Sequence, residues 1–248
     1  MNPEIQFRNK YKPDYSGMML AELPFCKLED HAGIPQTYRL DLITSIERPD
    51  RPIPVVLFVH GGGFTQPCDK RQAYISTFAR SLTKAGYAVV SPDYPIFDNK
   101  EQLNAAGGEA AGYAKAGEAV HLAYQYVVEH AVEMKVDPAR IAIIGGSAGG
   151  WAAFYGIGNY SDHYCAFINL WGAPEQIPNL AGFPPTLSVH GKADTLVPFQ
   201  REIHVQERLA ACGIDHCLIS LDGSGHTPLN RMGDFLPQMM ALLGKVLS

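Results

Sequence analysis

The stretch IAIIGGSAGGWAAF, residues 141–154, decides the fold. Four apolar residues lead into two glycines, Ser147 and a further run of small residues, which fits the pattern G-x-S-x-G. Between a buried strand and a helix, this pattern places a serine on a sharp, strained turn. Gly145 and Gly149 leave out the Cβ atoms that would collide across such a turn. We therefore predict that Ser147 is a nucleophile and that the N-terminus of the following helix faces the reacting oxygen.

A second glycine cluster ends the stretch VVLFVHGGGF, residues 55–64. Three adjacent glycines lose much backbone entropy on folding, so some feature of the fold must need bare backbone there. Neither cluster continues into GK[ST], and Gln66 and Ser147 occupy glycine positions of G-x-G-x-x-G, which argues against a phosphate or dinucleotide loop. A serine nucleophile instead needs N–H groups opposite it. We predict that this loop forms one wall of an anion site, with His60 bracing it.

Strand-like and helix-like patterns alternate along most of the chain. The expected strands are 37–46, 54–59, 87–91, 140–145, 165–171, 186–190 and 216–221, and the expected helices include 71–85, 118–134 and the last segment. This alternation predicts one α/β domain over residues 1–248, with a mostly parallel, doubly wound sheet and helices on both faces. Residues 1–36 are expected to form an N-terminal arm. The Ala- and Gly-rich segment 96–117 is expected to be a loop insertion, either a surface excursion or part of a cleft wall.

A serine nucleophile needs a base, and the base needs an acid that orients it. Of the nine histidines, His226 follows the strand at 216–221 in a loop of small residues, where its ring would lie over the carboxyl edge of the sheet. For the acid, Asp194 comes shortly after the strand at 186–190. The chain order Ser147, Asp194, His226 is the order of one known fold.

Other candidates for these roles have simpler interpretations. Asp222 lies only four residues before His226 and would have to reach back within its own loop. Asp93 is expected to be a structural carboxylate that pairs with backbone N–H groups. His190 ends a buried strand and is expected to be packed, and the remaining histidines are expected at the surface or in packing.

Four segments in order, HGGGF (60–64), GGSAGG (145–150), HGKADTLVP (190–198) and GSGHTP (223–228), resemble the HGGG-bearing esterases of the α/β-hydrolase fold. These are related to hormone-sensitive lipase and to bacterial acetyl- and carboxylesterases. The chain differs from the larger lipases, because the connection from about 170 to 186 is too short for a helical lid. The resemblance therefore implies an α/β-hydrolase with little or no lid domain.

The resemblance also assigns roles. Ser147 would be the nucleophile, His226 the general base and later acid, and Asp194 the orienting acid. The oxyanion hole would be formed by the N–H groups of Gly62, Gly63 and Ala148. No metal and no organic cofactor is required. Phe64 and Trp151 are the candidates for substrate contact, although Phe64 could equally pack beneath the loop.

The expected reaction is hydrolysis of carboxylic esters with short acyl groups through an acyl-enzyme. Sugar acetates, small aryl esters and feruloyl-type esters all suit an open cleft. Two alternatives stay open: an amidase, formamidase or peptidase of the same fold, because the same triad cleaves amides, and a non-catalytic ligand-binding module on this scaffold.

Composition limits the partners. The net charge is −5 and no Lys/Arg run is present, so neither nucleic acid nor an anionic membrane surface is expected as a partner. No stretch reaches the length of a membrane span, and the first residues lack the apolar core of a signal peptide. The five cysteines are scattered without metal-site spacing and suggest reduced thiols in a cytoplasmic protein. The expected partner is a small-molecule ester, and the sequence leaves a homo-oligomer open.

Overall fold

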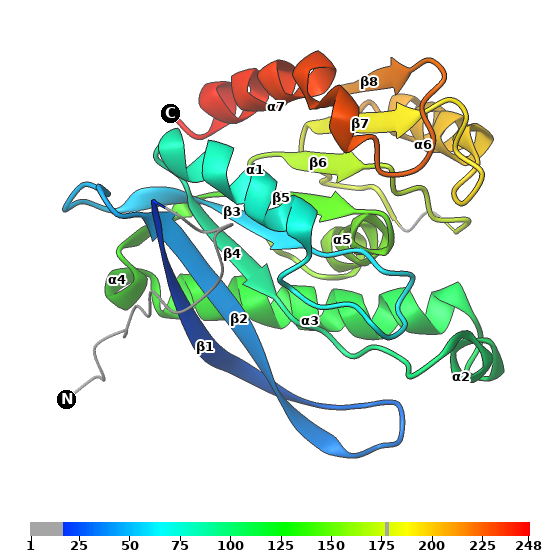
Figure 1. Cartoon of the computed structure of the whole chain (residues 1–248), viewed down its shortest axis with the longest axis horizontal. Coiled ribbons are helices and arrows are strands. Elements are labelled where there is room, and N and C mark those ends of the chain that lie inside the picture. Colours follow the sequence, from blue (N-terminus) through cyan, green and yellow to red (C-terminus); the bar gives the residue numbers. More distant parts are fainter. Residues whose placement is uncertain (1–16, 177–178) are drawn as a thin grey trace.

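The computed structural model describes residues 17–176 and 179–248, and its centre is an eight-stranded sheet (Figure 1). The strand order is β1-β2-β4-β3-β5-β6-β7-β8. The strands are β1 (Met18–Glu29), β2 (Pro35–Ser45), β3 (Ile53–Val59), β4 (Ala88–Pro92), β5 (Val136–Gly146), β6 (Phe167–Leu170), β7 (Thr186–Gly191) and β8 (His216–Leu221). The helices are α1 (Ala73–Lys84), α2 (Lys100–Ala105), α3 (Glu109–Glu129), α4 (Ala131–Met134), α5 (Ala148–Asn159), α6 (Phe199–Ala211) and α7 (Met232–Val246), with a 3₁₀ turn at Leu229–Arg231.

Six of the strands run parallel and end at the same edge of the sheet. β2 is antiparallel to both of its neighbours, β1 and β4, whereas the pairs from β4 through β3 and β5 to β8 are all parallel. The loops that follow β3, β5, β7 and β8 therefore meet at one edge, as ligand sites do in open α/β sheets. The prediction of a mostly parallel sheet with helices on both faces is confirmed.

The sheet separates two hydrophobic cores, and β3 shows why its sequence is continuously apolar. Val55, Leu57 and Val59 pack in the core beneath α3, α5 and α6. Val56 and Phe58, on the opposite side of the same strand, pack beneath α1 and α7. Figure 1 shows these two helix layers on either side of the sheet. A strand buried on both faces has no position for a polar residue.

The segment 96–117 is not the expected loop insertion. It contains α2 and the first turns of α3, so the helix expected over 118–134 begins earlier, at Glu109, and is followed by the separate short helix α4. The side chain of Asn99 caps α2 by accepting a hydrogen bond from the N–H of Gln102. Small residues let α3 approach α5 closely, because a Cβ on Gly117 would lie 2.5 Å from Tyr155. The alanines in this segment are therefore helix formers rather than loop residues.

Two further elements were absent from the expected pattern. β1 occupies most of the described part of the arm 1–36 and pairs with β2 along its whole length, with a register shift between Pro24 and Cys26. The remainder of the arm lies outside the described residues. α6 was also not predicted. Among the described helices, none combines the length and the apolar character that crossing a membrane would need.

Candidate active site

Ser147 lies on a strained turn between β5 and α5. Its backbone has φ 52° and ψ −122°, a conformation that is costly for a residue with a side chain. The turn is held by close backbone packing, since a Cβ on Gly149 would lie 2.2 Å from the carbonyl oxygen of Val59 and one on Gly145 would lie 2.5 Å from that of Gly149. The predicted strand–turn–helix is therefore present, and it lifts Ser147 to the end of the sheet.

Three side chains from three different loops form a chain of hydrogen bonds. Ser147 Oγ lies 2.9 Å from His226 Nε2, and His226 Nδ1 lies 2.7 Å from Asp194 Oδ2. The other carboxylate oxygen of Asp194 accepts from the N–H groups of Leu196 and Val197, at 2.9 and 3.0 Å. With Nδ1 donating to the carboxylate, Nε2 of His226 is free to accept the Ser147 proton.

The loops that carry Asp194 and His226 are fixed against each other. The N–H of Ala193 donates to the carbonyl of Ser224 at 2.9 Å, and a Cβ on Gly191 would lie 2.4 Å from that same carbonyl oxygen. Thr227, directly after His226, has a positive φ of 56°. These contacts hold the imidazole over the carboxyl edge of the sheet.

The loop with three glycines lies beside the Ser147 turn, because a Cβ on Gly61 would be 2.7 Å from the carbonyl oxygen of Gly146. Gly62 and Gly63 both have positive φ, at 119° and 63°. In the described part of the chain, no backbone hydrogen bond uses the N–H of Gly62 or Gly63. Ala148 is the first residue of α5, so its N–H has no partner within the helix either.

Buried side chains hold the rest of this loop by its backbone. The Tyr74 hydroxyl accepts from the N–H of Gly61 at 2.6 Å, and the Tyr94 hydroxyl donates to the carbonyl of His60 at 2.7 Å. The Gln72 side chain donates to the carbonyl of Gly61 at 3.0 Å. The His60 ring is buried, stacks on Tyr94 with centroids 4.1 Å apart and donates through Nδ1 to Gly61. His60 thus braces the loop, as predicted.

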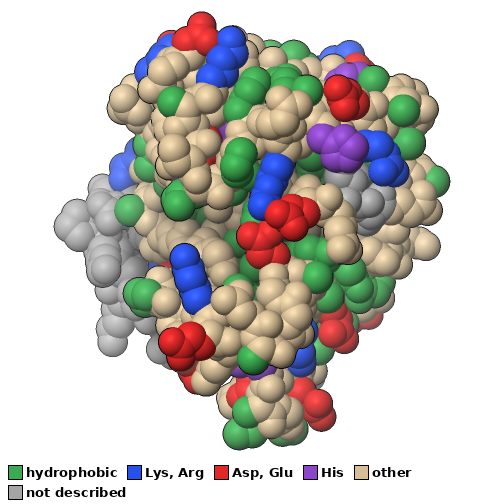
Figure 2. Space-filling view, turned by 90° about the vertical axis from the view of Figure 1, so that its right-hand side faces the viewer, with side chains coloured by type: hydrophobic (Ala, Val, Ile, Leu, Met, Phe, Trp, Pro, Cys, Tyr) green, Lys and Arg blue, Asp and Glu red, His purple; other side chains and the backbone are tan. Residues whose placement is uncertain are grey.

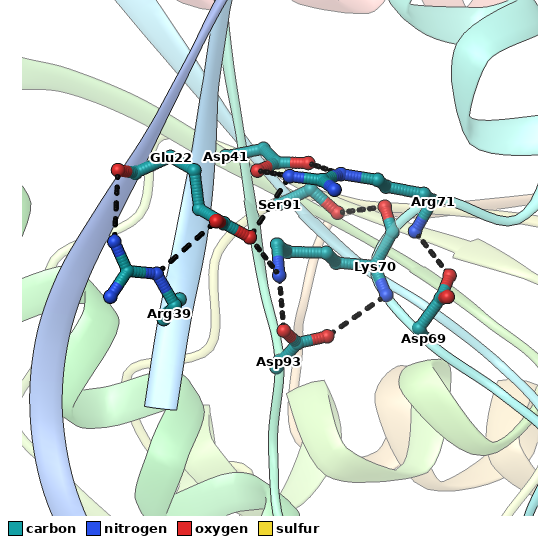
Figure 3. Close-up of polar contacts among 8 residues, drawn as sticks. All are labelled: Glu22, Arg39, Asp41, Asp69, Lys70, Arg71, Ser91 and Asp93. Carbon is teal, nitrogen blue, oxygen red and sulfur yellow. Dashed lines mark hydrogen bonds and ion pairs between the residues drawn. The ribbon is translucent and has the colours of Figure 1, made fainter. Parts of the chain in front are cut away.

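A cluster of charged residues lies next to the connection between this loop and α1 (Figure 3). Lys70, whose side chain is 6% exposed, forms ion pairs with Asp93 and, at 3.2 Å, with Glu22 of β1. Arg71 forms a bidentate ion pair with the fully buried Asp41 of β2, with N–O distances of 2.6 and 2.8 Å. Burial raises the pKa of Asp41. For Glu22, the three nearby cations outweigh burial and lower the pKa. The cluster ties the antiparallel hairpin to the glycine loop.

The residues considered for substrate contact differ in exposure. Phe64 is fully buried in the core, and its ring lies 6.0 Å from that of Trp151 and 6.2 Å from that of Tyr94. Phe64 therefore packs beneath the loop, and its proposed contact with substrate is corrected. Trp151, one turn after Ser147 on α5, lines a cavity of about 220 Å³ and lies below the guanidinium of Arg201 at 6.0 Å.

The face at the carboxyl edge mixes side chains of opposite charge. Figure 2 looks onto this face and shows acidic and basic side chains next to each other near its middle. Among the charged residues, Arg201 pairs with Glu175 and, at 3.5 Å, with Glu109 at the start of α3. Within the described ranges, no three His, Cys, Asp or Glu side chains gather into a group that could hold a metal ion.

The structure separates the rival acids from the site. Asp222 forms an ion pair with Lys192 at 2.7 Å, and Asp93 accepts from the backbone N–H of Lys70 and pairs with its side chain.

Two residues that contact the site were not anticipated in these roles. Tyr74 holds the N–H of Gly61, and Glu202 of α6 lies fully buried behind Asp194 and His190. Glu202 could not be singled out from the sequence, because its charge interrupts the apolar stripe of α6.

The fold and the arrangement of Ser147, His226 and Asp194 define an α/β-hydrolase. The chain belongs to the BD-FAE family, whose model matches residues 40–165, about half of the chain. It is 31% identical over 139 residues to dipeptidyl aminopeptidase BIII of Pseudoxanthomonas mexicana, covering 55% of this chain and 19% of that protein. It is 27% identical over 135 residues to esterase B1 of Culex pipiens, covering 52% and 23%. The chain thus spans about a fifth of the length of these curated relatives.

Solved structures share the fold over nearly the whole chain. The dienelactone hydrolase-like promiscuous phosphotriesterase P91, from metagenomic libraries, superimposes with a TM-score of 0.71 at 16% identity, covering 94% of this chain and 100% of that one. Esterase Est2 of Thermogutta terrifontis gives 0.66 at 21% identity, covering 96% and 94%. At such identities the likeness establishes a shared fold.

Proposed function

We propose that the protein is a serine hydrolase that cleaves carboxylic esters with short acyl groups. The observation that carries the proposal is the unbroken hydrogen-bond chain from Asp194 through His226 to Ser147. Three backbone N–H groups, those of Gly62, Gly63 and Ala148, make no backbone hydrogen bond among the described residues and would form the oxyanion hole. The similarity to esterase B1 supports the same activity.

In the first half of the reaction, Ser147 Oγ attacks the ester carbonyl while His226 Nε2 takes its proton. Asp194 stabilises the imidazolium that forms and keeps the ring in the correct tautomer. Negative charge then develops on the former carbonyl oxygen and is met by the N–H groups of Gly62, Gly63 and Ala148. Each such preorganised donor contributes on the order of 3 kcal/mol to lowering the barrier. His226 passes its proton to the leaving alcohol, and an acyl-enzyme remains.

In the second half, His226 removes a proton from water, and the resulting hydroxide attacks the acyl-enzyme. The same N–H groups stabilise the second oxyanion, and His226 returns the proton to Ser147 Oγ as the acid departs. Every proton is carried by this chain's own imidazole, so the cycle closes without any further group.

Short acyl groups and compact alcohols fit the surroundings of Ser147. The connection between β6 and β7 holds neither helix nor strand in its described residues, so these residues form no helical lid over the site. Trp151, one turn after Ser147 on α5, belongs to a cavity of about 220 Å³ that is also lined by Tyr113, Phe154, Tyr155 and the amide side chains of Asn159, Gln176 and Asn179. Small aryl esters and sugar acetates match this combination of aromatic and amide side chains.

Replacement of Ser147 tests the proposal. Ser147→Ala should lower kcat on p-nitrophenyl acetate by more than about 10³-fold, because the nucleophile is lost while the fold is retained. Ser161→Ala, at an exposed serine beyond α5, is the matched control and should behave like wild type. A fluorophosphonate probe should label the wild type and the control but not Ser147→Ala. Turnover by Ser147→Ala near the wild-type rate would overturn the assignment.

Peptide or amide cleavage is a second candidate, because the 31% identical relative is a dipeptidyl aminopeptidase. The same triad can form an acyl-enzyme from an amide. Turnover of p-nitrophenyl acetate is compared with turnover of the matched amide p-nitroacetanilide. A series of esters from acetate to octanoate then measures the preference for acyl length. Ester turnover that exceeds anilide turnover and falls with acyl length supports the proposal, and the reverse preference would favour an amidase.

A further inference from the structure

A second imidazole–carboxylate pair lies behind Asp194. His190, the penultimate residue of β7, has its Nε2 atom 2.8 Å from the carbonyl oxygen of Val197 and 3.3 Å from Asp194 Oδ2. Its Nδ1 atom faces Glu202 Oε2 on α6 at 3.7 Å. The side chains of His190, Asp194 and Glu202 are all 0% exposed. Behind Ser147, imidazole rings and carboxylates thus alternate in the order His226, Asp194, His190 and Glu202.

Both carboxyl oxygens of Glu202 accept hydrogen bonds from side-chain amides. Oε2 accepts from the amide of Asn169 at 3.0 Å, and Oε1 accepts from the amide of Gln206 at 2.6 Å. Both oxygens therefore serve as acceptors, which is the role of a carboxylate. A charge buried to this degree needs an opposite charge nearby. All ion pairs of Glu202 and Asp194 within the described residues are with histidine.

The position of His190 identifies where the compensating charge lies. Because Nε2 faces two acceptors, it carries a hydrogen in either neutral or charged form of the ring. A neutral ring would then direct the lone pair of Nδ1 at the Glu202 carboxylate, which is repulsive. A proton on Nδ1 replaces this repulsion with attraction. Burial alone lowers the pKa of His190, but Glu202, Val197 and Asp194 together raise it above its usual value.

We propose that His190 is a positively charged positioning residue, held between Glu202 and Asp194, that fixes the Asp194 carboxylate for its contact with His226. This inference rests on the proposed hydrolase function of the same site. Two buried carboxylates and one imidazolium leave one uncompensated negative charge. His226 neutralises that charge when it takes the proton of Ser147. The charged groups that face His190 are Glu202 from α6 and Asp194 from the loop after β7, with His226 beyond Asp194.

The protonation state of the His190 ring can be measured by NMR in the wild-type protein. In protein labelled with ¹³C,¹⁵N-histidine, the ring signals of His190, assigned by their absence in His190→Asn, should show both nitrogens protonated at neutral pH. A neutral ring at neutral pH would overturn the proposal. The measurement needs no substrate, so it stays decisive if ester turnover is absent, an outcome that would overturn only the proposed function.

The positioning role is tested with Glu202→Gln, which removes the charge but keeps the shape. His190 should then lose its second proton at neutral pH. On p-nitrophenyl acetate, kcat should fall by about tenfold while KM stays within about twofold, because Asp194 orients His226 less firmly in the transition state only. Glu207→Gln, an exposed carboxylate on the same helix, is the matched control and should change neither reading. An unchanged kcat in folded Glu202→Gln, checked by near-UV circular dichroism, would overturn the positioning role.

Discussion

Two buried histidines at the ends of parallel strands differ in their surroundings. His60, after β3, is 1% exposed and stacks on the neutral ring of Tyr94. His190, in β7, is 0% exposed and lies between the carboxylates of Glu202 and Asp194. Burial lowers the pKa of His60, whereas the partners of His190 raise its pKa despite burial. The same side chain at similar depth is therefore a neutral brace on one side of Ser147 and a cation on the other.

The difference reflects what each side of the site must do in the proposed reaction. The glycine loop offers backbone N–H groups to a developing negative charge, and its supports, Tyr74, Tyr94 and His60, are neutral hydrogen-bonding groups. On the other side of the site, Asp194 orients the ring that transfers the proton. The residues behind Asp194, His190 and Glu202, carry charge. Substitutions on the two sides should therefore differ in size and in pH dependence.

The largest effect is expected for His190→Asn. Removing the ring leaves Glu202 and Asp194 without the cation between them, and breaking a buried pair in this way costs about 3–5 kcal/mol of unfolding free energy. Urea denaturation at neutral pH measures the loss. The double variant His190→Asn with Glu202→Gln should lose less unfolding free energy than the sum of the two single losses. The reason is that Glu202→Gln also removes the carboxylate that His190→Asn leaves without a partner. Simple additivity would mean that the two residues do not interact.

The next largest effect is expected for Tyr74→Phe on the neutral side. The N–H of Gly61 then has no acceptor while it stays buried, which costs about 1–3 kcal/mol. The loss should be independent of pH from weakly acidic to weakly alkaline conditions, because no charge changes. Because the glycine loop shifts, kcat on p-nitrophenyl acetate should fall more than KM rises. A pH-dependent loss of stability would show that this side also depends on a titrating group.

More of the candidate site than of the surrounding helices and strands could be predicted from the sequence. Ser147 directly follows a strand, and Asp194 and His226 lie in the loops after two other strands, so the alternation of strands and helices predicted that they meet at one edge of the sheet. The pairing of His190 with Glu202 could not be read, because it joins β7 to α6 and depends on how the helix is rotated against the sheet.

The elements that were missed share a physical reason. α6 places Glu202, Val205 and Leu209 on its buried face, so a charged residue interrupts the apolar stripe that would have revealed the helix. β1 is an edge strand that contains Pro24, and both features weaken a strand pattern. The segment 96–117 is rich in glycine, which suggests a loop, yet at Gly117 the residue serves close packing of α3 on α5.

The pH dependence of stability should distinguish the two histidines. The folded-state pKa of His60 is lowered below 6.5, so its contribution is present above that pH and is lost as the pH falls. The folded-state pKa of His190 is raised above 6.5, so its contribution is complete below that pH and is lost as the pH rises. The cost of His60→Gln should therefore shrink toward acid, and the cost of His190→Asn should shrink toward alkali. Each changes by at most about 1.4 kcal/mol per pH unit.

Urea midpoints measured on both sides of pH 6.5 test these opposite slopes. The wild type serves as the reference at each pH, so titrations elsewhere in the chain cancel in the difference. Parallel slopes for His60→Gln and His190→Asn would contradict the assignment of a neutral and a charged ring.

The smallest effect is expected for Gly63→Ala on the glycine loop. Gly63 has φ 63°, and no atom lies within 4 Å of the place that a Cβ would take, so an alanine there meets only the strain of the left-handed backbone, about 1 kcal/mol. Gly213, after α6, has φ 69° and equally open surroundings, which makes Gly213→Ala a matched control for strain alone. Both variants should lose similar stability in urea, but only Gly63→Ala should lower kcat, by less than about tenfold, because relief of the strain turns its N–H away from the oxyanion. Equal kcat values in the two variants would place the oxyanion contacts at Gly62 and Ala148 instead.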